Sequence, residues 1–489
     1  MTTIASMTNM RLKFPGVESL LFEDFSLSFE KGEKVLILGP SGSGKSTLLQ
    51  VLTGLIPSAV AVPMKADALT IPESWGFLFQ DPDAQFCMPY VDEEIAFVLE
   101  NLQIPREEME QYIDHYLHQV GLRFDDNHTK IQTLSGGMKQ RLAIASVLAL
   151  EPELLCLDEP TAMLDPEGTK LVWDTIKNVG NDKTVVIVEH KIEQVVDFVD
   201  RVILLDENGT IIADGPKQQV FDQYKHVLIE QGIWYPGVWE DYMQDKSRHI
   251  PQSVNTEDAK PAVHLSDFSA FRGKVKALQV EEARAHPGEW VTILGENGAG
   301  KSTLLLAMMN LLKTTGTYKI FEQDYKRIKH LAEYVSFVFQ NPEFQFVTNS
   351  VYEEIAFSLH LAKWEQEKIA RRVDEMLKLY YLEDYRHTHP YQLSMGQKRR
   401  LSVAASIVKE QPIILLDEPT FGQDAKNTFA ILEQLEQLRA QGTTIIMVTH
   451  DLNIVKNFAT KVWRMEDGEL VMESPAPNDI ETLQPAVIS

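Results

Sequence analysis

Length, composition and charge exclude several classes of protein. The chain has 489 residues, 44% of them hydrophobic, with only two cysteines and a formal net charge of −25. The acidic total argues against a nucleic-acid partner, and two cysteines outside any ligand cluster imply neither a disulfide framework nor a zinc site. No uninterrupted apolar run approaches the roughly 18 residues that a membrane helix needs, and the start of the chain lacks the apolar core of a signal peptide, so we expect a protein that stays in the cytosol.

The first predicted elements in chain order are a strand and a helix joined by a glycine-rich turn. An apolar run at Lys34–Leu38 leads into GPSGSGKST, residues 39–47, which opens a helical pattern over residues 46–55. The same order recurs about 260 positions later, where a run at Trp290–Leu294 leads into GENGAGKST, residues 295–303. Chance does not preserve order, spacing and residue type over several segments, so the pattern indicates a duplicated nucleotide-binding unit.

Each glycine-rich turn carries the pattern G-x-x-x-x-G-K-S/T, which predicts a phosphate cradle. The glycines let backbone N–H groups turn toward phosphates, and the helix N-terminus adds a favourable dipole. Lys45 and Lys301 should reach the β- and γ-phosphates of ATP, and Ser46 and Ser302 should ligate Mg²⁺. The residues predicted to bind nucleotide here are Gly39, Pro40, Ser41, Gly42, Ser43, Gly44, Lys45, Ser46 and Thr47 in the first copy and Gly295, Glu296, Asn297, Gly298, Ala299, Gly300, Lys301, Ser302 and Thr303 in the second.

The next repeated feature is a glutamine at the end of an apolar run. Gln80 and Gln340, 260 positions apart, head the segments QDPDAQF and QNPEFQF. A neutral amide at this point can touch Mg²⁺ or the attacking water, although a lone glutamine at a strand end is usually only a polar cap. The stretches that follow, at residues 92–120 and 352–381, have amphipathic helical spacing, and we expect each to form a small helical subdomain beside the sheet.

Two acidic residues follow each of the next predicted strands, at residues 154–157 and 413–416. This position is the carboxyl edge of a parallel sheet, where the ligands of open α/β folds bind. Side chains of consecutive residues point in different directions, so the first acid can join the metal shell while the second orients and deprotonates the attacking water. The acids are Asp158 and Glu159 in the first copy and Asp417 and Glu418 in the second.

A histidine ends the last of the paired strand candidates, at residues 185–188 and 445–448. A donor at the same edge of the sheet could hold the γ-phosphate. We therefore assign this role to His190 and His450, although either alone would more often be a structural histidine. Strands that alternate with helical patterns imply the α/β class, with a mostly parallel sheet covered by helices.

The repeat divides the chain into two tandem P-loop nucleotide-binding domains. We expect the first at residues 1–230 and the second at 263–475, joined by a linker at 231–262 that contains prolines and shows weak periodicity. Each domain is long enough to bury a core without disulfides or metals.

Together these motifs resemble the ATP-binding cassette (ABC) ATPases over almost the whole chain. The segments LSGGMKQR (134–141) and LSMGQKRR (393–400) are similar to the family's signature sequence, which opens a helix whose N-terminus binds the γ-phosphate of ATP held on the opposite unit. The resemblance therefore implies two composite ATP sites. By the same likeness, Phe14 and Phe271 look like the aromatic residue that stacks on adenine, with Phe268 as a competitor. The signature residues implied are Ser135, Gly136, Gly137, Ser394, Gly396 and Gln397.

The chain departs from the family pattern at a few positions. Met138 replaces the last signature glutamine, Met395 replaces the first signature glycine, and Gln423 replaces the usual leucine just before Asp424. The corresponding segment of the first copy, TAMLD, ends at Asp165 and fits the family. These departures imply two hydrolytic sites that are unequal.

The chain looks like the ATPases of energy-coupling factor (ECF) importers in the segments FQDPDAQF (79–86) and FQNPEFQF (339–346) and in the EEIAF blocks to which they lead, at residues 93–97 and 353–357. That likeness implies an ATPase on the cytoplasmic face of the membrane, with a transmembrane coupling (T) component and a substrate-capturing (S) component as partners. One interpretation exposes the acidic face of the block to a basic partner, and the other buries Ile95, Phe97, Ile355 and Phe357; both can hold, since one face can pack while the acidic face meets the partner. Cargoes of that family are vitamins, their precursors or metal ions, and we favour a hydroxymethylpyrimidine (HMP) of the thiamine pathway.

Two alternative functions stay open at this point. A soluble tandem ABC ATPase acting on ribosomes or nucleic acid usually has a long basic helical linker, whereas this linker is punctuated by proline and carries Trp234, Tyr235 and Trp239. The fused ATPase of simple-sugar importers usually departs from GKS/T in its second phosphate loop, which is intact here.

Overall fold

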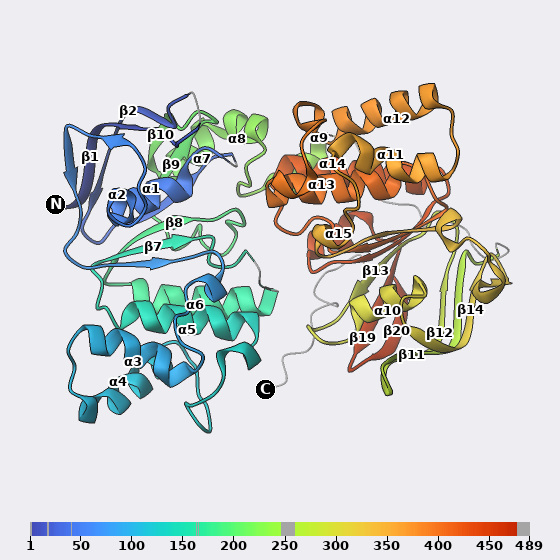
Figure 1. Ribbon diagram of the computed structural model, residues 1–489, viewed down its shortest axis with the longest axis horizontal. Coiled ribbons are helices and arrows are strands. Elements are labelled where there is room, and N and C mark those ends of the chain that lie inside the picture. The colour runs from blue at the N-terminus through green and yellow to red at the C-terminus, as the bar shows by residue number, and fades with distance from the viewer. Residues whose placement is uncertain are drawn as a thin grey trace. The chain divides into compact units, whose positions relative to one another are not determined.

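The computed structural model describes residues 2–16, 19–40, 42–162, 164, 166–245 and 260–476. The chain forms two compact units, unit 1 (Met1–Val238) and unit 2 (Trp239–Ser489). Figure 1 shows unit 1 in blue to green and unit 2 from the green of its first helix through yellow to red. Each unit contains one copy of the repeated motifs.

The central sheet of unit 1 has the strand order β10-β9-β3-β8-β7-β6, and every neighbouring pair is parallel except β9 with β10. The strands expected at residues 34–38, 154–157 and 185–188 are confirmed as β3, β7 and β8. Their runs of buried apolar residues are typical of parallel strands covered on both faces. The strands are β3 (Lys34–Leu38), β6 (Trp75–Leu78), β7 (Leu154–Asp158), β8 (Thr184–Val188), β9 (Arg201–Leu205) and β10 (Ile211–Pro216).

A second, antiparallel sheet in unit 1 shares its hydrophobic core with the central sheet. This core joins side chains such as Phe22, Phe29, Val35 and Leu48. Figure 1 shows α1 on one face of the central sheet and α5 and α6 on the other. The strands and helices concerned are β1 (Thr3–Leu12), β2 (Phe22–Glu30), β4 (Met64–Lys65), β5 (Ala68–Thr70), α1 (Lys45–Leu52), α5 (Gly136–Leu148) and α6 (Pro166–Gly180).

The strands of unit 2 form one mixed sheet of ten strands, in the order β15-β14-β11-β12-β20-β19-β13-β18-β17-β16. The expected strands at residues 290–294, 413–416 and 445–448 are confirmed as β13, β17 and β18. The strands are β11 (Val263–Arg272), β12 (Val275–Ala285), β13 (Trp290–Leu294), β14 (Lys313–Ile320), β15 (Gln323–Asp324), β16 (Val335–Val338), β17 (Ile413–Asp417), β18 (Thr444–Val448), β19 (Lys461–Glu466) and β20 (Glu469–Pro475).

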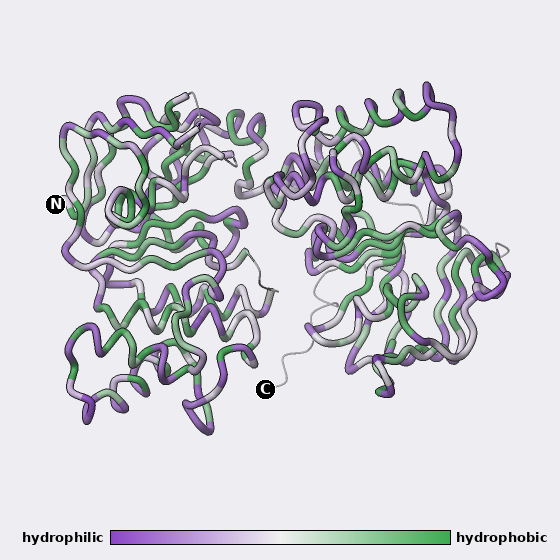
Figure 2. Tube along the Cα trace, in the orientation of Figure 1, coloured by the Kyte–Doolittle hydropathy of each residue, from purple (hydrophilic) through white to green (hydrophobic). Residues whose placement is uncertain are grey.

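Helices cover both faces of the unit 2 sheet. In Figure 1, α10 (Lys301–Met308) lies on one face, and α13 (Met395–Ile407) and α14 (Ala425–Ala440) lie on the other. Figure 2 shows that the central strands of both units are hydrophobic whereas many connecting loops are hydrophilic. The predicted α/β class with a mostly parallel core is therefore confirmed.

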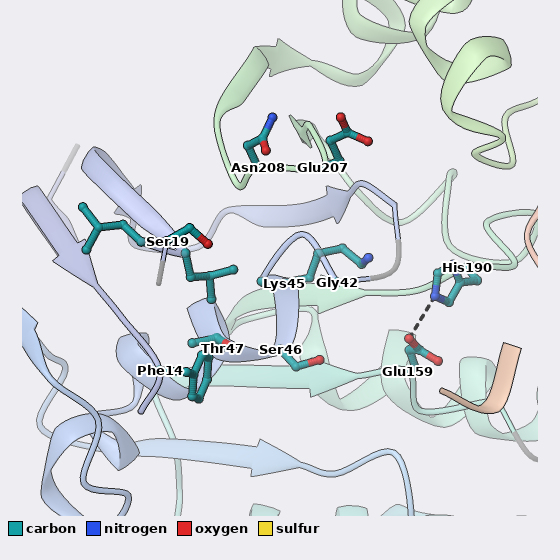
Figure 3. A pocket seen from close by; sticks show the side chains of 13 residues that line it. Phe14, Ser19, Gly42, Lys45, Ser46, Thr47, Glu159, His190, Glu207 and Asn208 are labelled. Atoms are coloured by element: carbon teal, nitrogen blue, oxygen red, sulfur yellow. Dashed lines mark ion pairs between the residues drawn. The ribbon is translucent and has the colours of Figure 1, made fainter. Parts of the chain in front are cut away.

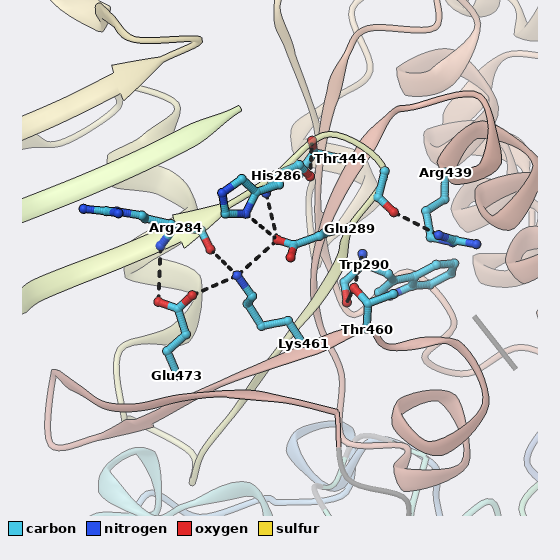
Figure 4. A network of polar contacts seen from close by, with 10 residues as sticks. Arg284, His286, Glu289, Trp290, Arg439, Thr444, Thr460, Lys461 and Glu473 are labelled. Carbon is cyan, nitrogen blue, oxygen red and sulfur yellow. Dashed lines mark hydrogen bonds and ion pairs between the residues drawn. The ribbon is translucent and has the colours of Figure 1, made fainter. Parts of the chain in front are cut away.

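A polar network at the amino end of β13 joins strands of unit 2 (Figure 4). The Lys461 ammonium group lies 3.1 Å from the Glu289 carboxylate and 2.9 Å from that of Glu473, and it donates to the Arg284 carbonyl at 2.8 Å. Glu289 also accepts from the His286 backbone N–H at 2.7 Å. These contacts hold β12, β13, β19 and β20 in register, and they lie at the opposite end of β13 from the phosphate loop.

The helix expected at residues 46–55 is shorter in the structure. It is α1, which ends at Leu52, and a separate short helix, α2 (Leu55–Ser58), follows. Gly54 has φ +71°, which is left-handed and stops the helix. A hydrophobic pattern alone does not reveal such a stop, because the apolar residues continue on both sides of the glycine.

The helical subdomains each contain a pair of helices in place of one continuous stretch. They are interrupted at residues with positive φ, Gln103 and Lys363, and in unit 1 also by Pro105, which precedes the second helix. In unit 1 both helices contact α5, which begins at the signature segment, and in unit 2 the first helix of the pair contacts α13, its counterpart. The helices are α3 (Val91–Asn101), α4 (Arg106–Gln119), α11 (Val351–Leu361) and α12 (Gln366–Leu379).

The structure corrects one position in each interpretation of the EEIAF blocks: the second glutamate is not exposed, and the phenylalanine is not buried. The second glutamate of each block is buried, because Glu94 accepts from the Cys87 and Met88 N–H groups at 2.9 and 2.8 Å, and Glu354 makes the same kind of contact in unit 2. These carboxylates are therefore not part of an acidic outer face. Ile95 and Ile355 are buried as expected, whereas Phe97 and Phe357 are exposed.

The predicted linker contains an ordered helix within the described residues. The helix α9 (Val238–Asp245) lies in this region, and α8 (Lys225–Gln231) ends where the predicted linker begins. The Tyr242 ring stacks on Phe429 of α14 with 3.7 Å between centroids, and its hydroxyl donates to Glu433 at 3.2 Å. Ile233, Trp234, Tyr235 and Trp239 are buried. The part of the linker at residues 246–259 lies outside the described residues.

The two cysteines have opposite environments. Cys156 is buried in β7, where burial raises the pKa of its thiol, and Cys87 is exposed. Cys156 thus packs as a small hydrophobic residue of the unit 1 core. Among the helices in the described part of the chain, none combines the length and hydropathy needed to cross a bilayer.

Candidate functional site

The two phosphate loops lie at the carboxyl ends of β3 and β13 and open α1 and α10. In unit 1 the Lys45 ammonium group donates to the carbonyls of Gly39 and Pro40 at 2.7 and 2.8 Å. Lys301 makes the same two contacts, with Gly295 and Glu296, at the same distances. The sequence thus produces one loop geometry twice. Ser41, which we also expected at this site, lies outside the described residues.

Glycine is required at Gly44, the residue that precedes α1. Its φ of +90° is left-handed, and a Cβ built there would lie 2.7 Å from Cζ of Phe22. Gly42 has a similar φ of +91° but open space where its Cβ would be. The loop therefore needs glycine at Gly42 for backbone conformation and at Gly44 for both conformation and close packing.

The aspartates that end β7 and β17, Asp158 and Asp417, lie in surroundings that fit a magnesium ion. The Ser46 hydroxyl donates to Asp158 Oδ1 at 2.9 Å, which brings two oxygen ligands together. In unit 2, Asp417 is buried, and its Oδ1 has no hydrogen-bond partner within the described part of the chain. Burial raises the pKa of each aspartate to about 6. A hydroxyl and a carboxylate beside a phosphate cradle fit a hard divalent cation.

Three predicted side chains meet at Glu159. Its carboxylate lies 3.0 Å from Nε2 of His190 (Figure 3). It also accepts from the Gln80 amide at 2.9 Å. Burial disfavours the charge on Glu159, but the contact with His190 and the charges of His190 and Lys45 outweigh it, so the pKa of Glu159 is lowered. The carboxylate is therefore ionised at neutral pH and able to accept a proton.

The corresponding pair in unit 2 is more widely spaced. His450 Nε2 lies 3.4 Å from Glu418 Oε1. The pKa of Glu418 is lowered as well, because contact with His450 and the charges of Lys301 and Arg399 outweigh its burial. Gln340 follows β16 at the same edge of the sheet.

A cavity of about 640 Å³ in unit 1 brings many of the predicted residues together (Figure 3). It opens onto the phosphate loop and reaches from Phe14 to His190. Sequence reasoning missed part of its wall, since no pattern marks these residues. The predicted residues in the wall are Phe14, Gly42, Gly44, Lys45, Ser46, Thr47, Glu159 and His190, and the additional ones are Ser19, Leu20, Leu21, Glu207 and Asn208.

The aromatic candidates differ in exposure. Phe14 is 36% exposed and lines the cavity. In unit 2, Phe268 is fully buried in the hydrophobic core, whereas Phe271 is half-buried. Phe268 therefore has no free face for a base, which leaves Phe271 as the candidate in that unit.

The signature segments form helix N-termini. Ser135 caps α5 by accepting from the Met138 N–H at 3.3 Å. Ser394 caps α13 in the same way, and there Gln397 completes a capping box by accepting from the Ser394 N–H at 2.9 Å. A methionine side chain has no group for this second contact, so the departure at Met138 leaves α5 with the weaker cap. Gly136, Gly137 and Gly396 lie in the first turns of these helices.

Two buried charged residues near the catalytic acids were missed by sequence reasoning. In unit 2, Arg399 of α13 donates to the Phe339 carbonyl at 3.0 Å. Burial lowers its pKa to about 10 despite the nearby charges of Glu418 and Asp417. In unit 1, Glu189 precedes His190 and is 3% exposed. The only signal was that the two copies of the repeat differ at these positions. Gln140 of the first copy corresponds to Arg399 of the second, and Glu189 corresponds to Thr449.

Comparison with known proteins identifies the family. Residues 22–162 and 279–421 match the family described as ABC transporter. The chain belongs to this family. It is therefore an ATP-binding, ATP-hydrolysing enzyme of the kind coupled to transport, with two tandem nucleotide-binding domains.

Relatives extend the match to nearly the whole chain. A Bacillus subtilis (strain 168) protein, YkoD, whose name describes an HMP/thiamine import ATP-binding protein, is 37% identical over 94% of this chain and 89% of its own length. An ABC transporter ATP-binding protein of Methanosarcina mazei is 32% identical over 96% of this chain and 88% of its own. An archaeal ribosome recycling factor, aABCE1, shares the fold with a TM-score of 0.64 at 20% identity, covering 97% of this chain and 91% of its own.

Proposed function

We propose that this protein is the ATP-hydrolysing subunit of an ECF importer that takes up a thiamine precursor of the HMP class. The observation that carries the proposal is the 37% identity to YkoD over most of both chains. The likeness of FQDPDAQF, FQNPEFQF and the EEIAF blocks to ECF ATPases supports it independently. Its partners would be a T component and an S component, which would hold it at the cytoplasmic face of the membrane.

In the proposed reaction, Glu159 and Glu418 each accept a proton from the water that attacks the γ-phosphate. Both carboxylates are ionised at neutral pH, as a base must be, and the support for this role is their position beside the histidines, since a lowered pKa by itself weakens a base. His190 and His450 would donate to the γ-phosphate while they hold the glutamates in place. Gln80, which donates to the second oxygen of Glu159 at 2.9 Å, would help to orient the water.

The remaining residues of the proposed sites bind nucleotide and metal. Mg²⁺, when bound, neutralises charge on the β- and γ-phosphates. The adenine would stack on Phe14 or Phe271, and the signature serines and glycines would supply further phosphate contacts. The proposed metal ligands are Ser46, Gln80 and Asp158 in unit 1 and Ser302, Gln340 and Asp417 in unit 2.

Replacing both proposed bases tests the hydrolytic assignment. We expect the Glu159→Gln, Glu418→Gln double variant to hydrolyse ATP at least about 10² times more slowly, because removal of a positioned base costs about that factor. ATP binding should persist, so radiolabelled ATP should stay with the double variant through gel filtration. Glu110→Gln, a change at an exposed glutamate of α4, is the control and should turn over normally. Normal turnover in the double variant would contradict the assignment.

Reconstitution tests the transport assignment. The chain, expressed with the membrane proteins encoded beside it, should co-purify with them in mild detergent and support ATP-dependent uptake of labelled HMP into vesicles. The likeness to the ribosome recycling factor shows the fold alone, and the net charge of −25 disfavours ribosomal RNA. Co-sedimentation with ribosomes in low salt, without membrane partners, would contradict the importer proposal.

A further inference from the structure

The two units differ at one buried position beside the proposed γ-phosphate histidine. Unit 1 has Glu189 before His190, and unit 2 has Thr449 before His450. Glu189 is 3% exposed and Thr449 is 4% exposed, so neither faces solvent. A carboxylate is retained in such a place only when other groups compensate for its burial.

Three donors surround the Glu189 carboxylate, and they come from two different loops. Oε2 accepts from the Thr161 hydroxyl at 2.8 Å, and Oε1 accepts from the His190 N–H at 3.0 Å and, more weakly, from the Lys191 N–H at 3.4 Å. Thr161 lies in the turn that begins with Glu159, after β7. Glu189 therefore joins the turn that carries Glu159 to the turn that carries His190.

Among the described residues of unit 2, no side chain at this position makes an equivalent link between the two turns. The Thr449 hydroxyl accepts from the Asp451 N–H at 3.1 Å, a contact within its own loop. The distance from histidine to glutamate is shorter in the unit that has the link. It is 3.0 Å between His190 and Glu159 and 3.4 Å between His450 and Glu418.

The charges around Glu189 place it in the same electrostatic group as the catalytic pair. Burial raises the pKa of Glu189 to about 7, opposed by the Thr161 hydroxyl, and the facing charges are those of Glu159 and His190. Burial lowers the pKa of His190, but Glu159 and then Glu189 favour its charged form, against Lys45, and the net pKa is raised. Near neutral pH, Glu189 therefore affects the charge of His190 as well as its position.

We propose that Glu189 is a positioning residue that fixes the pair of Glu159 and His190 in unit 1, and that its absence from unit 2 makes the two ATP sites hydrolyse ATP at different rates. The inference rests on the proposed roles of Glu159 and His190. It gives the two hydrolysis rates a cause that lies within each unit, beside its histidine. This cause is separate from the departures in the signature segments.

The test exchanges the residue for the one that unit 2 carries. Glu189→Thr in the full chain should fold, since Thr449 occupies the same place in unit 2. Histidine ¹³C NMR, with the His190 signal assigned by its loss in His190→Gln, would follow the titration of His190. We expect its midpoint to fall by about 0.5 pH unit or more, because a facing carboxylate favours the imidazolium form.

Kinetics supply the second readout. We expect Glu189→Thr to lower kcat several-fold while KM for ATP stays within about two-fold, since the reacting groups lose alignment and the phosphate loop does not. Glu189→Gln, which keeps an acceptor oxygen, should restore part of kcat. The matched control is Glu94→Gln, because Glu94 is also buried and also accepts from two backbone N–H groups, but far along the chain from His190.

The outcomes separate the possibilities. A lower His190 midpoint and a lower kcat in Glu189→Thr, with neither in Glu94→Gln, would support the proposal. An unchanged His190 titration, an unchanged kcat, or equal behaviour of the Glu94 and Glu189 variants would overturn it. Failure of the proposed function would appear elsewhere, as normal turnover in the Glu159→Gln, Glu418→Gln variant, while the NMR titration would still report the contact of Glu189.

Discussion

Two neighbouring acids in this protein have opposite electrostatic environments. Asp158 and Glu159 are consecutive, yet burial raises the pKa of Asp158 to about 6 while contact with His190 lowers that of Glu159. Burial decides the direction for Asp158, against the hydrogen bond from the Ser46 hydroxyl, whereas the contact with the His190 imidazole decides it for Glu159. Asp158 is thus suited to bind a cation, and Glu159 is suited to accept a proton.

The raised pKa of Asp158 predicts a pH-dependent stability in the chain without nucleotide or metal. The folded state releases this proton near pH 6 and the unfolded chain near 3.8, so the contribution of Asp158 to stability is present below pH 3.8 and is lost as the pH rises through 6. We therefore expect Asp158→Asn to melt at a higher temperature than the natural chain at pH 7, with a much smaller difference at pH 4.

Circular dichroism melts in the presence of EDTA would measure this effect. The control is Asp125→Asn, at an exposed aspartate, which should leave the melting temperature nearly unchanged at both pH values. A lower melting temperature for Asp158→Asn at pH 7 would mean that other charges near Asp158 outweigh its burial.

At the scale of single elements, the two signature helices differ in one capping contact. Ser394 and Gln397 form a capping box at α13, whereas Met138 leaves α5 with a serine cap only. Met138→Gln should therefore stabilise unit 1, and Gln397→Met should destabilise unit 2, each by about 0.5–1 kcal/mol.

Urea unfolding of the full chain, followed separately for the two variants, measures these changes, and each variant is the control for the other. The midpoint that moves in Met138→Gln is assigned to unit 1, and the midpoint that moves in Gln397→Met is assigned to unit 2. Movement in the same direction for both changes would contradict the capping explanation, since the substitutions are opposite in sense.

Elements were predicted well where the sequence repeats a local rule and poorly where tertiary contacts decide. The buried strands and the phosphate loops could be located because apolar runs and the G-x-x-x-x-G-K-S/T pattern are local signals. The end of α1 at Leu52 could not, because Gly54 stops the helix inside an apolar stretch. The burial of Glu94 could not either, since its partners are backbone groups of the preceding loop.

The same limit applies to the candidate site. Repeated motifs located Lys45, Asp158, Glu159 and His190, whose residue types are tied to phosphate chemistry. Glu189 carries no motif, and its meaning depends on the contact with Thr161 across two loops. A difference between internal copies was visible in the sequence, but its consequence was not.

For the whole molecule, the proposal of composite sites predicts that hydrolysis needs both units. Joining them in one chain gives roughly millimolar effective concentration, so assembly of the sites does not depend on protein concentration. Residues 1–245 and 260–489, purified separately, should each hydrolyse ATP far more slowly than the full chain, and activity should return as their mixed concentration is raised.

A steady-state ATPase assay over a dilution series would measure this dependence, with gel filtration to establish the state of each half. The undivided chain, whose turnover per molecule should not change on dilution, is the control. Full turnover by either half as a monomer would contradict the requirement for both.

The contrast between Cys87 and Cys156 offers a means of watching this protein at work. The sequence holds only these two thiols, and the one in β7 is shielded from reagents, so a maleimide dye should attach to a single position without any engineering. That position lies in the segment between Gln80 and α3, next to the loop anchored by Glu94. Fluorescence from the natural chain would then register whether the arrival of ATP disturbs this segment in real time.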